Sequence, residues 1–97
     1  MTTDDTDLPL DALHPDPRNA RTHDARNLAL ITDALRDVGA ARSIVVDETG
    51  TVLAGNATLA AAGSAGIARV RIVDADGTEL IAVRRRGLTP DQKQRLA

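Results

Sequence analysis

The chain has 97 residues, a formal net charge of −2 and 42% hydrophobic residues, and it contains no Phe, Tyr, Trp or Cys. This length predicts one domain, and the absence of Cys excludes disulfides, thiol catalysis and thiolate metal sites. The absence of aromatic side chains excludes base stacking as a way to bind single-stranded nucleic acid. No run of about 18 apolar residues occurs, so no membrane partner is expected and the predicted location is cytoplasmic.

The first residues, 1–7 (MTTDDTD), are polar and acidic and predict a disordered tail, with the folded domain over 8–97. Residues 8–13 (LPLDAL) predict a short first strand. Pro9 has no N–H to donate, so this strand is expected at an edge or with an irregular start.

A stiff loop follows at 14–21 (HPDPRNAR), where two prolines favour extended backbone over helix. The loop carries two cations, Arg18 and Arg21, which a stiff backbone places at low entropic cost. They either bind an anion or pair with Asp16 and Asp24.

Residues 27–38 predict a helix, with Asp24 as N-cap and Gly39 as its C-terminal stop. Its apolar residues share one stripe at helical spacing: Leu28, Ile31, Leu35 and Val38. Residues 44–46 and 51–54 predict a β-hairpin that leads into the next helix.

That helix is predicted over 57–65, with Asn56 as its N-cap. Residues 69–73 alternate between charged and apolar side chains and predict a strand, and 78–83 predict its hairpin partner.

A last helix begins at Thr89, which forms a capping box with Gln92 and is followed by Pro90. The chain stops after two turns of this helix, which indicates a longer parent protein, a completing partner or a frayed end. The order of elements predicts a small mixed α/β (α+β) domain with a short sheet, hairpins and three helices.

The stretch AGNAT is a candidate phosphate site. A helix N-terminus presents free N–H groups and partial positive charge, and a glycine before it lets a phosphate approach the backbone. Gly55, Asn56 and Thr58 are therefore candidate phosphate ligands. The alternative is an ordinary capped helix, in which Asn56 bonds to its own backbone.

Three consecutive arginines, 84–86, precede the last helix and indicate contact with the phosphates of a nucleotide or of DNA. Arg84, Arg86 and Lys93 are the predicted DNA contacts. The alternative is an edge strand that is protected from aggregation by its charges. Nothing in the chain forms a catalytic triad or a Walker loop, so no catalytic residue and no metal ligand is predicted.

Taken in order, these segments resemble the N-terminal domain of the ParB family, the ParB/sulfiredoxin-like fold, over about residues 8–97. The matching segments are LDALHPDPRNAR, NLALITDALRDVG followed by SIVVD, AGNATLAAAGSAGI, and IAVRRRGLTPDQKQRLA. The family has a strand leading to an arginine loop, then a helix ending in glycine, then a glycine-initiated alanine-rich helix.

The resemblance implies a pocket for a cytidine nucleotide, with Arg21 and Arg85 at family arginine positions beside Gly55. Two departures weaken that pocket. The family's Glu-Arg-Arg is Asn56-Ala57-Thr58 here, and its Glu-Asn is Ile81-Ala82. We therefore expect CTP or another nucleotide with Mg²⁺ to bind weakly or not at all.

The function expected from the resemblance is a DNA-associated or nucleotide-sensing module, of the kind used in phage or plasmid partition. It would act with a partner protein or with a downstream DNA-reading domain that the sequence lacks. A ParB-like nuclease or phosphotransferase is one alternative. A non-catalytic oligomerisation domain, such as a homodimer, is another.

Overall fold

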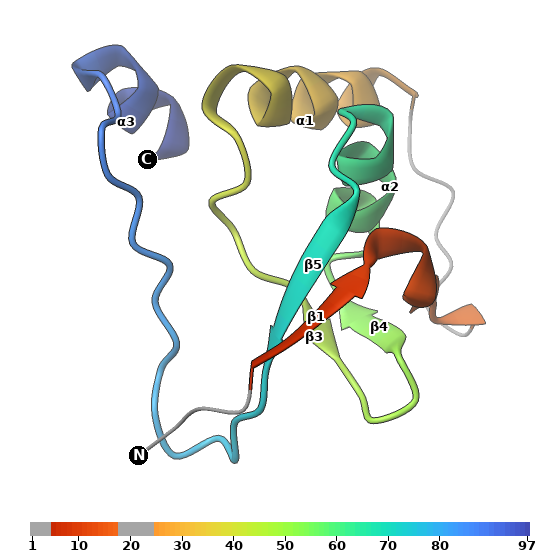
Figure 1. Cartoon of the computed structure of the whole chain (residues 1–97). Helices are drawn as coiled ribbons and strands as arrows, with labels where there is room; N and C mark the ends of the chain where they lie inside the picture. The colour runs from red at the N-terminus through yellow and green to blue at the C-terminus, as the bar shows by residue number, and fades with distance from the viewer. Residues whose placement is uncertain (1–4, 18–24) are drawn as a thin grey trace.

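The structure, a computed structural model, describes residues 5–17 and 25–97 (Figure 1). Both helices and strands occur along these residues, and the prediction of a mixed α/β domain with three helices is confirmed. In chain order the elements are β1 (Asp5–Pro9), the 3₁₀ turn η1 (Leu10–Ala12), β2 (His14–Pro15), α1 (Ala25–Val38), β3 (Val45–Val46), β4 (Thr51–Ala54), α2 (Asn56–Ser64), β5 (Arg69–Val73) and α3 (Pro90–Leu96).

The strands form two small sheets. In one, β1 pairs antiparallel with β5, from Asp5 opposite Val73 to Pro9 opposite Arg69. In the other, β4 lies between β2, which is parallel to it, and β3, which is antiparallel. The predicted hairpin over 44–54 is therefore confirmed, and it leads directly into α2.

The hairpin turn is closed by the carboxylate of Asp47. This carboxylate accepts hydrogen bonds from the hydroxyl and backbone N–H of Thr49 and from the backbone N–H of Thr51, at 2.7, 2.9 and 3.0 Å. The hydroxyl of Thr49, followed by the backbone N–H of Thr51, lowers the pKa of Asp47 because these donors stabilise the ionised form. The turn is thus held by the charged carboxylate, and its contribution to stability would be lost as the pH falls through that lowered pKa.

The core is small because its side chains are small. The buried apolar residues are Leu13, Val38, Val52, Ala61 and Ala62. Alanines on α2 let α1 pack closely against it, and α1 adds a buried Thr32 whose hydroxyl donates to the carbonyl of Leu28 at 2.8 Å. Small side chains bury little apolar area each, so the free energy of unfolding is expected to lie at the low end of the range for domains.

Two predicted strands are placed differently in the structure. The first strand lies at 5–9 instead of 8–13, so it takes in residues 5–7 of the predicted tail, while 10–12 form a 3₁₀ turn. The predicted strand over 78–83 is absent: these residues run extended from the end of β5 toward α3 without strand pairing (Figure 1). We call residues 78–88 the strap.

The strap ends at α3, which is anchored on α1 by polar contacts. The predicted capping box is confirmed, since the Thr89 hydroxyl accepts from the Gln92 N–H at 3.2 Å and the Gln92 Oε1 accepts from the Thr89 N–H at 3.0 Å. Gln92 Nε2 also donates to the carbonyl of Asp37 at 3.2 Å, and Arg95 forms an ion pair with the carboxylate of Asp37 at 2.7 Å. These contacts hold the far end of the strap at the C-terminal end of α1.

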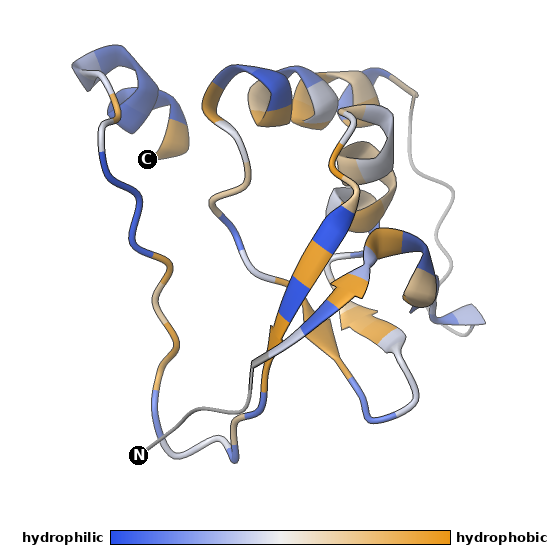
Figure 2. Cartoon of the chain, in the orientation of Figure 1, coloured by the Kyte–Doolittle hydropathy of each residue, from blue (hydrophilic) through white to orange (hydrophobic). Residues whose placement is uncertain are grey.

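Figure 2 shows that the strap has an apolar stretch before the strongly polar part that carries the arginines. Leu80, Ile81 and Val83 are exposed there, Leu80 to 95%. Across the ranges 5–17 and 25–97, every helix is too short or too polar to cross a bilayer.

Candidate functional site

Gly55 joins β4 to α2 and is required by the fold itself. Its φ is +96°, in the left-handed region that favours glycine. A Cβ added there would lie 2.5 Å from Cγ2 of Ile44, closer than two carbons can approach. The backbone angle and the contact with Ile44 thus account for the glycine before any ligand is considered.

The prediction that Asn56 is the N-cap of α2 is wrong. Gly55 is the N-cap, and Asn56 is the first helical residue. The side-chain Nδ2 of Asn56 donates back to the carbonyl of Val52 at 3.1 Å, while its buried Oδ1 has no hydrogen-bond partner among the described residues. Because the left-handed Gly55 makes the turn, no described side chain caps α2, and the amide of Asn56 bonds to β4 instead.

The backbone at the start of α2 retains the geometry of an anion site. The first hydrogen bond back to the cap is donated by the N–H of Leu59 to the carbonyl of Gly55 at 2.9 Å, so the N–H groups before it point out of the helix end. Thr58 is half-buried in this first turn. The backbone arrangement of an anion site is therefore present, but residues 55–58 carry no positively charged side chain.

Arg85 caps a different helix. Its Nη1 donates to the carbonyl of Ala40 at 3.0 Å, and a Cβ at Gly39 would lie 3.4 Å from both Nη1 and Nη2. The guanidinium therefore packs against the glycine that ends α1, where a cation is favoured by the helix dipole. The predicted convergence of Arg85 with the start of α2 has no contact to support it in the described residues. Arg21, the other predicted arginine, lies outside them.

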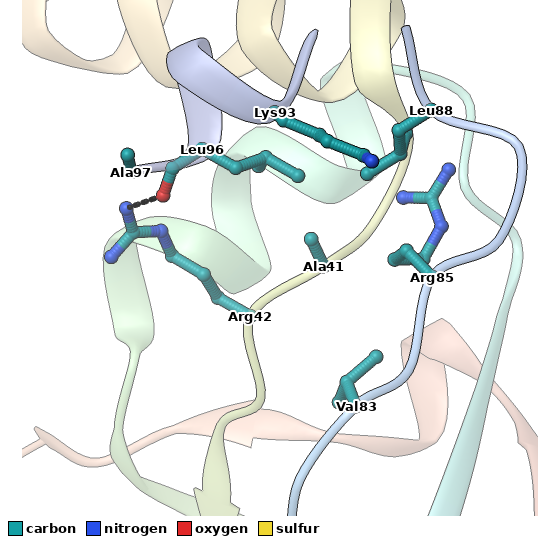
Figure 3. A pocket seen from close by; sticks show the side chains of 8 residues that line it. All are labelled: Ala41, Arg42, Val83, Arg85, Leu88, Lys93, Leu96 and Ala97. Atoms are coloured by element: carbon teal, nitrogen blue, oxygen red, sulfur yellow. Dashed lines mark hydrogen bonds between the residues drawn. The ribbon is translucent and has the colours of Figure 1, made fainter. Parts of the chain in front are cut away.

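Arg85 instead lines an open cavity of 460 Å³ between α3, the strap and the segment after α1 (Figure 3). We call this cavity the basic groove. Its lining residues are Ala41, Arg42, Val83, Arg85, Leu88, Lys93, Leu96 and Ala97. Three of these side chains are cationic and none is acidic.

The three cations of the groove are held in different ways. Arg42 donates from Nη2 to the carbonyl of Leu96 at 3.3 Å, which fixes it to the end of α3. Arg85 is fixed to Ala40, and Lys93 extends over the groove toward the side on which Arg85 lies (Figure 3). Two hydrogen-bonded guanidinium groups and one ammonium group form a concave surface suited to phosphate oxygens.

Of the predicted DNA contacts, Lys93 lines the groove, whereas Arg84 and Arg86 are exposed on the strap beside it. Arg42 was missed by the sequence analysis, because a single arginine between two short elements carries no local signal. The alternative interpretation of the loop at 14–21 places Asp16 in solvent, whereas Asp16 is only 3% exposed.

Among the described residues, three or more His, Asp or Glu side chains do not gather as a metal site would require. No family model matches the sequence. The chain is similar to the ParB-like nuclease domain-containing protein YnaK of Escherichia coli (strain K12), with 31% identity over 87 residues. The aligned region covers 90% of this chain and 88% of that protein.

The chain belongs to the ParB-like family. Because the similarity covers nearly the whole of both proteins, the ParB-like domain accounts for the described fold and not only for one motif. The resemblance inferred from the sequence is thereby confirmed. Within this ParB-like domain, the departures at Asn56, Ala57 and Thr58 occur at the start of α2, while the cationic side chains gather in the basic groove.

Proposed function

We propose that this ParB-like domain is a DNA-associated module that binds the phosphate backbone through its basic groove. The observation that supports this proposal is the convergence of Arg42, Arg85 and Lys93 on one open cavity whose lining has no carboxylate side chain. Such a surface gives sequence-independent affinity for phosphates, and that affinity falls steeply with salt.

The electrostatics favour a local contact over wrapping of the DNA. The chain as a whole carries a formal net charge of −2, so most of its surface does not attract a polyanion. Arg84 and Arg86 lie next to the groove on the exposed strap and extend its positive charge along the chain. The domain thus offers one cationic strip of limited length, which suits a short stretch of backbone.

The test is fluorescence anisotropy with a labelled DNA duplex across a range of salt concentrations. Arg42→Gln with Lys93→Gln is expected to weaken binding several-fold and to reduce the slope of log K against log salt by about 2, near one for each phosphate that the variant no longer neutralises. Arg69→Gln with Arg36→Gln is the matched control, since these arginines lie outside the groove and the pair removes the same charge. An equal weakening in both double variants would contradict the groove as the binding site.

The name of the relative YnaK favours nuclease activity as a second candidate function. The same DNA, as supercoiled plasmid with Mg²⁺ or Mn²⁺, distinguishes cleavage from binding on an agarose gel. Metal-dependent nicking that is abolished in Arg85→Ala would support a nuclease, whereas binding without nicking supports the DNA-associated module.

Calorimetry with CTP and with ATP in the presence of Mg²⁺ is expected to show no binding in the low-micromolar range. The reason is that the Asn56 amide is bonded to Val52 and Arg85 to Ala40, so neither is presented at the start of α2. A Thr58→Arg variant places a cation where the family's Glu-Arg-Arg carries an arginine, and it serves as a comparison. Low-micromolar binding by the unmodified chain would contradict the weakened pocket.

A further inference from the structure

The last helix, α3, lies beside the C-terminal end of α1 and is held there by polar contacts (Figure 1). All seven residues of α3 are at least partly exposed. In the described part of the chain, three hydrogen bonds tie α3 to other elements: Gln92 Nε2 to the carbonyl of Asp37 at 3.2 Å, Arg95 Nη1 to the carboxylate of Asp37 at 2.7 Å, and Arg42 Nη2 to the carbonyl of Leu96 at 3.3 Å. Two of these three bonds go to Asp37.

The spacing of residues along α3 places its anchor and its groove side on adjacent faces. Gln92 and Arg95 are three positions apart and share the face that is turned to α1. Lys93 and Leu96 are also three positions apart, and they share the adjacent face, which lines the basic groove (Figure 3). The contact that seats the first face on α1 therefore also sets the position of Lys93 in the groove.

Asp37 is not favoured by its own place in α1. It is the second-last residue of that helix, where the helix dipole is negative and disfavours a carboxylate. It also lies two positions before Gly39, on which the guanidinium of Arg85 packs, so its negative charge opposes the attraction of the groove for phosphates. The contact that offsets both effects is the ion pair with Arg95, which comes 58 positions later in the sequence.

This ion pair is exposed, so the seating of α3 is easily disturbed. The side chains of Arg95 and Asp37 are 45% and 44% exposed, and an exposed pair adds little stability and is screened by salt. A ligand that contacts α3 and the segment after α1 together binds only molecules in which α3 is seated. Its apparent affinity therefore depends on the fraction of seated molecules.

We propose that Asp37 is a positioning residue for the basic groove: its carboxylate seats α3, and the seated helix brings Lys93 to the two arginines of the groove. The inference rests on the proposed binding of DNA by this groove. It gives an expectation opposite to that from charge alone, because the loss of an acidic side chain beside the groove weakens the binding of a polyanion.

The test is a double-mutant cycle on DNA affinity, measured at low salt by fluorescence anisotropy with a labelled duplex. Asp37→Asn alone is expected to weaken binding about two-fold, which is near the effect of a lost exposed ion pair. In the Arg95→Gln background this pair is already broken, so Asp37→Asn is expected to strengthen binding through the removed negative charge. An equal change from Asp37→Asn in both backgrounds would overturn the proposal.

Asp33→Asn is the matched control for the removed charge. Asp33 lies one turn earlier on α1, and its carboxylate is 4.0 Å from Arg36 instead of a residue of α3. Its substitution removes the same charge without touching the anchor and is expected not to weaken DNA binding. Weakening of the same size by Asp33→Asn and Asp37→Asn would overturn the positioning role of Asp37.

Backbone NMR without DNA separates this inference from the DNA proposal. A helix of seven residues is unstable alone, so in Asp37→Asn the Cα chemical shifts of residues 90–96 are expected to move toward random-coil values, while those of α1 and α2 stay unchanged. Unchanged shifts over 90–96 would overturn the role of Asp37. A duplex that fails to bind the unmodified chain would instead contradict the DNA proposal.

Discussion

Gly55→Ala is expected to lower the free energy of unfolding by about 2–5 kcal/mol. A left-handed backbone costs a non-glycine residue about 1–2 kcal/mol, and forcing a methyl group into a filled site costs about 1–3 kcal/mol. Both effects apply here, because φ is +96° and the new Cβ would lie 2.5 Å from Ile44 Cγ2. Chemical denaturation followed by far-ultraviolet circular dichroism measures the change.

Gly66→Ala separates the two effects. Gly66 has a similar φ of +87°, but nothing lies within 4 Å of the position of its Cβ. It is expected to show only the backbone cost, so Gly55→Ala should be the more destabilising of the two. Adding Ile44→Ala to Gly55→Ala should recover part of the difference as a coupling between the two sites. Equal destabilisation by the two glycine variants would show that the contact with Ile44 relaxes without cost.

Leu13→Ala is expected to lower the free energy of unfolding by about 2–5 kcal/mol, the range for a buried leucine that is truncated to alanine. Leu13 is 6% exposed and is the largest of the buried apolar side chains among the described residues. The other members of the core are valines and alanines, which are too small to collapse into the space left behind. For a domain with such a small core, this destabilisation would leave a large fraction of molecules unfolded at 25 °C.

Leu30→Ala is the matched control because it makes the same substitution on α1 at a position that is 60% exposed. Its effect is expected within about 0.5 kcal/mol of zero. The two variants are compared by thermal and urea denaturation under the same conditions. Similar destabilisation by both would mean that Leu13 does not carry the core packing that its burial indicates.

The elements that could be predicted from sequence are those with a local cause. The stripe of apolar residues on α1, the capping box of Thr89 and Gln92 and the hairpin turn at Asp47 each depend on residues a few positions apart. The strand predicted over 78–83 depended on its place after the turn sequence at 74–77. Such a pattern does not say whether a partner edge lies within the same chain, and the anchors on α1 decide against it.

The candidate site could be predicted only in part. Lys93 was assigned from the charge of its segment, and it lines the groove. Arg85 was placed beside the start of α2 by family resemblance, whereas the structure places it at the end of α1. A long side chain can reach several helix ends, and the packing of segments distant in sequence decides which one it contacts. Arg42 was missed for the same reason.

The pairing of β1 with β5 has a consequence for how the domain forms during synthesis. The nearest pair of this sheet, Pro9 with Arg69, is 60 positions apart, and the whole α1–hairpin–α2 unit lies between its strands. Closing so long a loop costs entropy before any of the sheet's hydrogen bonds can form, and pairing at this separation slows folding. β1 can therefore pair only after β5 has been synthesised, so the α1–hairpin–α2 unit can form before this sheet closes.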